Sequence, residues 1–557
     1  MYQNVKIFRP YVFAILLSSL ILTGCKDIDC CMPGAITAYP PTITIMGTDN
    51  EEVIAIICNM SWNMITELPP WLEADPTPTS GSGNGTINVK AISPPAPDQD
   101  HSCVLTFKAA NGDQASVKIQ YGAALVSEIT LDPDEIVLSL NELALPTPWT
   151  ATLSADIMPL NADNKALNWN SDNSAVATVS LDGVVTITAV AGGIAIITAS
   201  ATDGSGVFGT CVITVTDGTE DYPFHINDLL DLEKLRDEVN AGDDKEGQYF
   251  IMTDGIVLPP ASWTPIGNTL GTPFSGHFDG NGKEVSGLYI SNSSSHGGLF
   301  GVVKDGTIEN LGVTVSGINK SIGHYVGGIA GDLNGGEVSR CYVIGDDPGT
   351  FIIGGSSIGG VVGYAYNDGK VVGCYASINV RGTQAIGGVV GRVDDGSSVE
   401  DCYATGNVEV SNQGGGGVVG RLIGSVTNCY ATGTISGTSL GPNPMYLGGI
   451  AGRIFAGGSV TNCVALNPRV STEHAANAYI GRVVGDNIGL PLGNNYAFID
   501  MDLLENGVPK TPVDDTTGLD GGDCPDSPAA SWWTTNMTTW LPSVWAFENT
   551  SRPTLIK

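Results

Sequence analysis

A glycine-rich motif that recurs about every thirty residues constrains this chain more than any other feature. The first half of the motif is a glycine pair, two apolar residues and a further glycine, and the second half is a valine three positions before a cysteine. Copies of the first half begin at Gly297, Gly327, Gly359, Gly387, Gly416 and Gly448, with a degenerate copy at Gly481, so successive copies begin 28 to 33 residues apart. Because both halves recur in order, the motif is a structural unit.

The period and composition of the repeat predict a parallel β-helix. A unit of this length cannot bury its own apolar face, so neighbouring units must stack. The many glycines and the short β-branched runs disfavour helices. Strands stacked one rung per repeat, about 4.8 Å apart, satisfy each other's backbone groups, and the connections are expected to be right-handed. We therefore expect a right-handed parallel β-helix over residues 297–500.

The cysteines of the second half are expected to form an inward-facing column. They are Cys341, Cys374, Cys402, Cys429 and Cys463. Stacked strands would hold their Cβ atoms farther apart than the roughly 3.8 Å that a disulfide requires. Metal sites need compact clusters of ligands, and these cysteines are some thirty residues apart. Buried free thiols are therefore the favoured interpretation, with a disulfide between rungs as the alternative.

This repeat resembles the GLUG motif of extracellular bacterial proteins. The resemblance covers roughly residues 297–500. It implies a β-helix on a secreted or surface protein and no single activity, because such repeats occur in adhesin-like proteins and also beside a peptidase domain in some immunoglobulin-cleaving enzymes.

The N-terminus predicts a lipid-anchored protein. Lys6 and Arg9 precede an apolar run over residues 11–22, which fits a signal peptide and is too short to span a membrane. The run ends in a Leu-Thr-Gly-Cys sequence that resembles the lipobox of bacterial lipoproteins. This resemblance implies removal of residues 1–24 and acylation of Cys25, so that lipid of the outer membrane is the expected partner of Cys25.

The residues after the lipobox indicate on which side of the outer membrane the protein is displayed. Residues 25–35 are expected to form a lipidated tether, and its charged start at residues 26–29 resembles the surface-export signal of Bacteroidetes lipoproteins. We therefore expect a protein anchored in the outer membrane and facing the cell exterior, with the periplasmic face as the alternative.

Two antiparallel β-sandwiches are expected between the tether and the β-helix. Residues 36–122 alternate apolar and polar residues over short runs and resemble the BACON domain, a family for which carbohydrate binding was proposed. Trp62 and Trp71 are candidate sugar-stacking residues, with a place in the core as the alternative. Cys58 and Cys103 lie on two expected strands and could pair in an oxidising compartment.

The second sandwich is expected over residues 125–217. The segments 164–171 and 175–179, followed by Asp182-Gly183 and a Val-Val-Thr strand, resemble the group 2 bacterial immunoglobulin-like domain. Such domains act mostly as spacers in surface proteins, and sometimes as binding modules.

Caps are expected at both ends of the β-helix. Residues 222–296 form the lead-in and contain an amphipathic helix with Asn227 as its N-cap, Leu232, Leu235 and Val239 on one face, and Gly242 at its end. This helix would cover the open first rung. Residues 501–557 carry four tryptophans and are expected to seal the last rung, with an exposed sugar-binding patch as the alternative.

Charge and motifs exclude several functions. Acidic residues outnumber basic residues 58 to 24, for a net charge of −34, which argues against nucleic acid as a partner. None of the six histidines lies in an H-E-x-x-H peptidase motif, and there is no G-x-S-x-G, P-loop or EF-hand sequence. We therefore predict no enzyme activity, no metal and no cofactor.

One regularity points to a ligand. Arg392, Arg421 and Arg453 each follow the last glycine of the motif, so stacking would align them on successive rungs, where they could bind an acidic glycan. A solvated, salt-bridged face is the alternative. The sequence thus predicts a non-enzymatic surface adhesin, or a protein that binds a glycan or a host surface. A β-helix polysaccharide lyase or glycoside hydrolase, and a purely structural envelope component, are the alternative functions.

Overall fold

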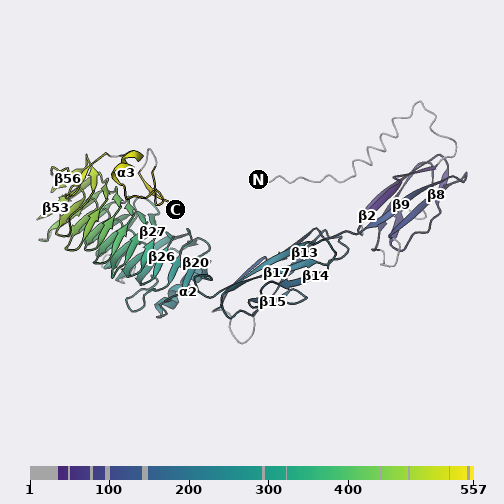
Figure 1. The fold of residues 1–557 in the computed structure, drawn as a ribbon, viewed down its shortest axis with the longest axis horizontal. Helices are drawn as coiled ribbons and strands as arrows, with labels where there is room; N and C mark the ends of the chain where they lie inside the picture. Colours follow the sequence, from purple (N-terminus) through teal and green to yellow (C-terminus); the bar gives the residue numbers. More distant parts are fainter. Residues whose placement is uncertain are drawn as a thin grey trace, which may run out of the picture. The chain divides into compact units, whose positions relative to one another are not determined.

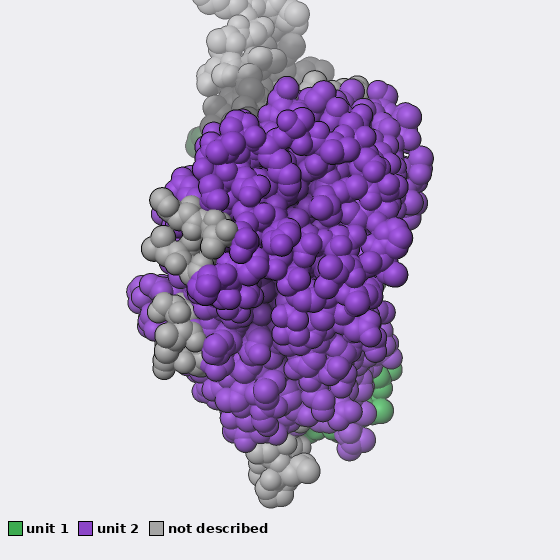
Figure 2. Space-filling view, turned by 90° about the vertical axis from the view of Figure 1, so that its left-hand side faces the viewer, with its two compact units in different colours: residues 1–137, 144–189, 194–214 green, residues 138–143, 190–193, 215–557 purple. Residues whose placement is uncertain are grey.

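The computed structural model describes residues 36–556, apart from residues 48–49, 76–79, 95–100, 141–148, 292–294, 321–322, 439–441, 474–476, 526 and 548–551. The expected signal peptide, Cys25 and the tether lie outside the described residues. The described chain is all-β, with two short helices. It divides into a first unit that holds both sandwiches and a second unit from residue 215 onward, to which residues 138–143 and 190–193 also belong (Figures 1 and 2).

The first domain is a β-sandwich of two sheets. One sheet has the order β1 (Ile36–Tyr39), β3 (Glu51–Cys58), β7 (Gly85–Ala91), β5 (Leu72–Asp75), and the other β2 (Thr42–Met46), β9 (Gln114–Gly122), β8 (Ser102–Ala109), β4 (Ser61–Met64), β6 (Ser80–Ser82). The pairing is antiparallel except between β2 and β9, which run parallel.

The core of this sandwich corrects the expectation for its tryptophans. Trp62 and Trp71 are 5% and 1% exposed, and Trp62 donates from Nε1 to the carbonyl of Gly83. Neither ring face can stack on a sugar, so the binding role predicted for them is wrong and the core alternative holds. The predicted Cys58–Cys103 pair is also absent, because both thiols are free.

The second domain is a sandwich of short strands. The sheets are β10 (Glu128–Asp132) with β13 (Ser154–Met158); β11 (Glu135–Ser139), β18 (Phe208–Thr216), β17 (Gly193–Ala201), β14 (Leu167–Ser171); and β12 (Thr150–Thr152), β16 (Val184–Ile187), β15 (Ala177–Val179). Alternate residues of the long strands β17 and β18 point into the core.

The second unit is a parallel β-solenoid whose rungs run from β19 (Phe224–Ile226) to β58 (Gly522–Cys524). The solenoid therefore extends beyond the repeat region of residues 297–500 at both ends. A nine-stranded sheet continues from β19 through β20 (Tyr249–Met252), β22 (His277–Asp279), β26 (Thr307–Glu309), β30 (Glu337–Ser339), β35 (Lys370–Val372), β40 (Ser398–Glu400), β45 (Ser425–Thr427) and β50 (Ser459–Thr461).

A 17-stranded sheet forms another side and holds the strand pairs of successive rungs. Its strands are β21 (Ile256–Val257), β23 (Glu284–Ile290), β27 (Gly312–Lys320), β31 (Tyr342–Gly345), β32 (Phe351–Gly354), β36 (Tyr375–Ser377), β37 (Asn379–Gly382), β41 (Tyr403–Ala404), β42 (Val408–Val410), β46 (Tyr430–Ala431), β47 (Ile435–Thr438), β51 (Val464–Ala465), β52 (Arg469–Glu473), β55 (Tyr496–Phe498), β56 (Asp502–Glu505), β57 (Val508–Pro509) and β58.

Two seven-stranded sheets complete the solenoid. The β24 sheet contains β24 (His296–Gly297), β28 (Tyr325–Val326), β33 (Ser356–Gly359), β38 (Gln384–Gly387), β43 (Gly414–Gly416), β48 (Met445–Gly448) and β53 (Ala478–Gly481). The β25 sheet contains β25 (Phe300–Lys304), β29 (Ala330–Asn334), β34 (Val362–Tyr366), β39 (Val390–Val393), β44 (Val419–Leu422), β49 (Ala451–Ile454) and β54 (Val484–Asn487).

The glycine pair of the motif forms the corner between these two sheets. A Cβ atom on Gly360 would come within 2.2 Å of the Gly388 carbonyl oxygen on the next rung, and one on Gly388 would meet Gly417 in the same way. The glycines are therefore required by close approach of neighbouring backbones.

The cysteines form the expected buried column of free thiols. The backbone N–H of Cys374 donates to Sγ of Cys402 at 3.3 Å, and that of Cys402 to Sγ of Cys429 at 3.4 Å. Asn495 continues the column beyond Cys463, whose N–H it accepts at 3.0 Å. The thiols thus satisfy backbone donors in addition to filling the core.

A helix caps the first rung. Helix α2 (Leu229–Asn240) buries Leu232, Leu235 and Val239 in the same hydrophobic core as β19 and β20. Its N-cap is Asp228, whose carboxylate accepts from the N–H groups of Leu230 and Asp231. The prediction of Asn227 as N-cap is wrong, because its side chain donates to Asp231 instead.

The C-terminal segment packs on a flank of the solenoid, which corrects the prediction that its aromatics seal the last rung. Residues 527–547, here called the strap, contain α3 (Ala530–Asn536) and β59 (Trp545–Ala546), which pairs with β60 (Thr554–Leu555). Trp533, Trp540 and Trp545 are buried against a ladder of stacked tyrosines that includes Tyr403 and Tyr430. These rings are covered, so they form no exposed sugar-binding patch.

Candidate anion-binding site

The three arginines predicted to align do lie side by side on consecutive strands. Arg392 of β39 pairs in register with Arg421 of β44, and Arg421 with Arg453 of β49. The same column holds Tyr364 before the arginines and Asp486 after them. Parallel pairing without a register shift places each side chain directly beside the next one, about 4.8 Å away.

Two of these arginines are neutralised and the middle one is not. Arg392 donates to both carboxylate oxygens of Asp394, at 2.8 and 2.7 Å, and Arg453 donates to Asp486 at 3.0 Å. Arg421 forms no ion pair with any described residue, and its buried Nε finds no acceptor there. The salt-bridged alternative therefore holds for the outer pair only.

Aromatic rings hold the guanidinium groups in place. The Arg421 Cζ atom lies 4.3 Å from the centre of the Phe455 ring, and Arg453 lies 4.7 Å from the same ring. Arg392 stacks on Tyr364 at 4.7 Å. Such contacts restrict the rotamers of the arginines before any ligand binds, so less conformational entropy is lost on binding.

The electrostatic environment of Arg421 opposes its charge. Burial, followed by repulsion from Arg392, lowers the pKa of Arg421. The pKa of Arg392 is raised, because its hydrogen bonds to Asp394 outweigh the effect of burial. An anion placed at Arg421 would relieve this repulsion.

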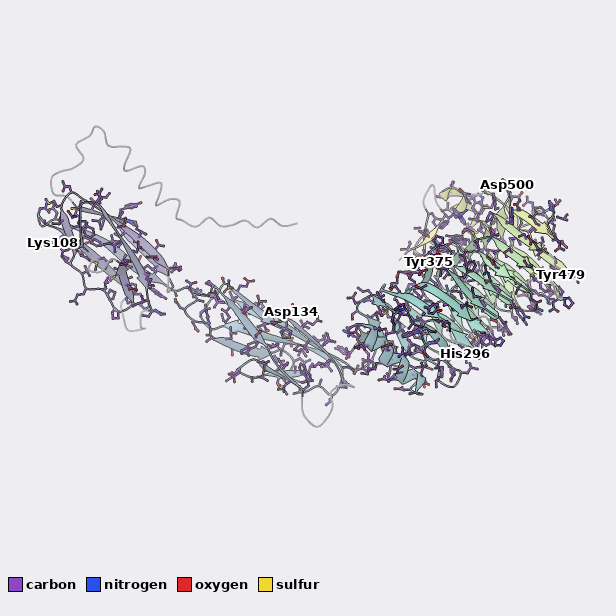
Figure 3. The ribbon with its side chains drawn as sticks, turned by 180° about the vertical axis from the view of Figure 1, so that it is seen from behind. Lys108, Asp134, His296, Tyr375, Tyr479 and Asp500 are labelled. Carbon is purple, nitrogen blue, oxygen red and sulfur yellow. The ribbon has the colours of Figure 1, made fainter. Side chains whose placement is uncertain are left out.

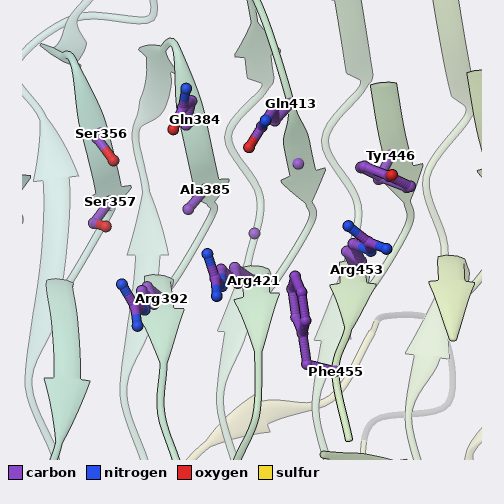
Figure 4. A pocket seen from close by; sticks show the side chains of 12 residues that line it. Ser356, Ser357, Gln384, Ala385, Arg392, Gln413, Arg421, Tyr446, Arg453 and Phe455 are labelled. Carbon is purple, nitrogen blue, oxygen red and sulfur yellow. The ribbon is translucent and has the colours of Figure 1, made fainter. Parts of the chain in front are cut away.

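A cavity of about 120 Å³ opens over the arginines (Figure 4). Its depth comes from the β24 sheet, where Ser357, Ala385 and Gly414 occupy one column on three rungs and Tyr446 occupies the next. Figure 4 shows Gln384 and Gln413 on the side of the cavity opposite the arginine column. Small side chains on adjacent rungs thus leave room where the neighbouring rungs have tyrosines.

The lining of the cavity is polar and contains neither a carboxylate nor an imidazole. None of the lining residues is Asp, Glu or His. The side chains of Ser356, Ser357, Gln384 and Gln413 make no hydrogen bond with another described residue, so they are free to bind a ligand. The site can hold an anion and hydrogen-bond hydroxyl groups.

A second polar cluster lies nearer the start of the solenoid. His296 Nε2 lies 3.2 Å from Oδ2 of buried Asp332, and the His296 ring stacks on Tyr325. In Figure 3 His296 and Tyr479 lie along one long edge of the solenoid and Tyr375 along the other. Both His296 and Asp332 are buried, so this cluster offers no open site.

The described ranges contain neither a metal-binding cluster nor a membrane-spanning helix. No group of His, Cys, Asp or Glu residues there is arranged to hold a metal ion. No helix within the described residues has the length and apolar character needed to cross a membrane.

Part of this site could have been recognised from the sequence. Asp394 stands two positions after Arg392, whereas Ile423 stands two positions after Arg421 and Phe455 two after Arg453. That comparison separates Arg392 from the other two arginines, whereas the partner of Arg453, Asp486, lies on the next strand and follows only from the strand register. The column of Ser357, Ala385 and Gly414 could be found only from the strand register.

Two family matches identify parts of the chain. Residues 134–214 match the bacterial Ig-like domain (group 2), as the sequence predicted. Residues 354–381, 382–409, 411–436 and 443–471 match the GLUG motif.

Curated relatives share only segments with this chain. Halomucin of Haloquadratum walsbyi is 32% identical over 164 residues, which is 27% of this chain and 2% of halomucin. A Gly-rich membrane protein of Evansella cellulosilytica is 31% identical over 106 residues, which is 18% of this chain and 12% of that protein. The chain therefore spans a small part of the length of these relatives.

Among solved structures, a proposed immunoglobulin A1 protease from Bacteroides ovatus is similar at 21% identity and a TM-score of 0.44, covering 61% of this chain and 93% of that chain. An intimin fragment in complex with its receptor's intimin-binding domain is similar at 13% identity and a TM-score of 0.16, covering 38% and 74%. An Ig-like domain joined to a GLUG-repeat β-solenoid is an architecture that fits a cell-surface protein.

Proposed function

We propose that this protein is a surface lipoprotein that binds an anionic glycan without cleaving it, through the cavity over Arg392, Arg421 and Arg453. The observation that carries the proposal is that Arg421 has no carboxylate partner among the described residues and faces a cavity lined by free hydroxyl and amide groups. Buried cations are normally paired, so an unpaired guanidinium supports a ligand that completes the pair.

The lining supports binding over catalysis. Glycoside hydrolases use two carboxyl groups on either side of the scissile bond, and the cavity has none. Lyases need a base, and the arginine and tyrosine residues of the lining are of types that keep their protons at neutral pH. The arginines fit the recognition of a carboxylate or sulfate group by paired hydrogen bonds.

Binding and cleavage are tested together on a glycan array that carries neutral and acidic oligosaccharides. We expect the full chain to retain acidic glycans, and mass spectrometry to find them at their original length. An Arg421→Gln variant should lose binding, whereas Arg381→Gln, which alters an exposed arginine paired with Glu409 on another sheet, should not. Shortened products would replace the proposal with an enzyme, and no binding to any glycan would favour a structural role.

Anchoring by Cys25 is a separate part of the proposal. The lipobox-like sequence before Cys25 supports acylation and export to the outer membrane. A Cys25→Ala variant should lose incorporation of labelled fatty acid and leave the membrane fraction. Protease treatment of intact cells then distinguishes an exterior from a periplasmic position. Unchanged lipid labelling in the variant would contradict the anchor.

A further inference from the structure

The cavity is smaller than most sites that hold a whole small molecule, and this limits how much of a ligand can enter it. Its volume is about 120 Å³. Sites for whole small molecules usually measure about 300–1,000 Å³. A carboxylate or sulfate group fits the cavity, and most of the ligand that bears it is then expected to lie outside.

The charge of the site limits the ligand further. The arginine column has three positive charges, and Asp394 and Asp486 neutralise two of them. One uncompensated charge remains at Arg421, on a chain whose net charge is −34. A ligand with one negative group satisfies Arg421, whereas a ligand with a charge on every sugar also meets repulsion from the acidic surface.

From these two limits we propose that the ligand is a sparsely charged polysaccharide that inserts one carboxylate or sulfate substituent into the cavity at Arg421. This inference rests on the proposed function and names its ligand class. The backbone sugars stay at the mouth, where Gln384, Gln413 and Ser356 offer free amide and hydroxyl groups to sugar hydroxyls. These neutral groups favour a sugar over an acidic peptide, whose neighbouring side chains would find few apolar partners.

The depth of the cavity is then the feature that selects a substituent, and Ala385 is the middle residue of the small column that gives this depth. Its φ of 52° is a left-handed conformation, in which asparagine is well tolerated. An Ala385→Asn variant should therefore fill the cavity from the β24 sheet while all three arginines remain. Arg421→Gln removes the charge and leaves the cavity open. The two variants separate the two requirements of the proposal.

The test compares three classes of hexasaccharide on an array: neutral, singly charged by one uronate or one sulfate ester, and charged on every residue. An acidic peptide serves as a fourth probe. The full chain should bind singly charged glycans at least tenfold more tightly than the other probes, and both Ala385→Asn and Arg421→Gln should abolish that preference. Arg381→Gln is the matched control, and circular dichroism confirms folding of each variant.

The outcomes separate the inference from the proposed function. Preference for a uronate or for a sulfate identifies which anion enters the cavity, and either supports the inference. Equal binding of neutral glycans, tighter binding of densely charged ones, or unchanged binding by Ala385→Asn would overturn the inference and leave glycan binding intact. Capture of the peptide alone, or of no glycan at all, would overturn the proposed function itself.

Discussion

Trp545 donates a hydrogen bond from its indole Nε1 to Oδ1 of Asp401, 144 residues earlier in the chain, at 3.0 Å. Asp401 lies at a left-handed bend, with a φ of 51°, and Asn428 and Asn462 occupy the same kind of bend on later rungs. The strap contacts these two as well, since Thr539 donates to the Asn428 side chain and Trp540 to the Asn462 carbonyl. The strap thus recognises the bends of successive rungs.

Trp545→Ala should release the strap without unfolding the solenoid. The tryptophan is 1% exposed and packs in a hydrophobic cluster separate from the solenoid core. Removing such a side chain costs about 3–5 kcal/mol, which is expected to fall on the strap. Hydrogen exchange should show faster exchange in residues 527–547 and unchanged exchange in the solenoid strands.

Variants of Asp401 provide the matched control. Asp401→Asn keeps an oxygen acceptor and a residue that tolerates the left-handed bend, so it should leave strap exchange nearly unchanged. Asp401→Ala removes the acceptor and adds about 1–2 kcal/mol of backbone strain. If both variants behaved alike, the hydrogen bond from Trp545 would not hold the strap.

The buried thiols of Cys402 and Cys429 should resist alkylation in the folded protein. Burial raises the pKa of Cys402 and of Cys429, and only the thiolate reacts. Half-buried Cys103, whose pKa burial raises to about 11, should react slowly at pH 8. Mass spectrometry after iodoacetamide treatment should find Cys402 and Cys429 unmodified in native protein and modified in urea. Native labelling of Cys402 within minutes would contradict the buried column.

The sequence predicted features that repeat, and it failed where two distant segments meet. Alignment of Arg392 with Arg421 follows from a constant position within the repeat. The cavity depends on how the strand of Ala385 lies against them, which no local pattern encodes. The tryptophans were expected at the last rung because they follow it in sequence, yet hydrophobic burial favours the tyrosine flank. The N-cap was missed by one residue, because Asn227 and Asp228 are both good caps.

Asp332 should make stability depend on pH. Burial raises the pKa of Asp332, although its contact with His296 acts in the opposite direction. The folded state therefore holds the proton at a pH where the unfolded chain, with a pKa of about 3.9, has released it. Above the pKa of Asp332 in the folded state, the cost of burying its charged carboxylate destabilises the folded protein. This destabilisation disappears as the pH falls to the pKa of the unfolded chain.

The expected result is a stability difference between wild type and Asp332→Asn that changes with pH. The free energy of unfolding of the variant should increase relative to wild type as the pH rises through the folded-state pKa of Asp332, because the asparagine has no charge to bury. Urea unfolding between pH 4 and pH 8 measures this difference. A His296→Gln background removes the titration of the histidine, and a difference that stayed constant with pH in both backgrounds would contradict the assignment to Asp332.

Arg421 and Arg392 should respond oppositely to the same substitution. Arg421→Gln removes a half-buried charge that has no described partner and that its neighbour repels, so stability should stay the same or rise. Arg392→Gln leaves Asp394 without its cation, and Tyr364 still donates to that carboxylate at 2.6 Å. Loss of the paired charge should destabilise the protein by about 1–3 kcal/mol. Thermal unfolding of both variants, measured beside their glycan binding, therefore tests whether the chain retains Arg421 for a ligand: a site kept for binding loses affinity in Arg421→Gln without losing stability. A clear loss of stability in that variant would show instead that Arg421 has a structural role.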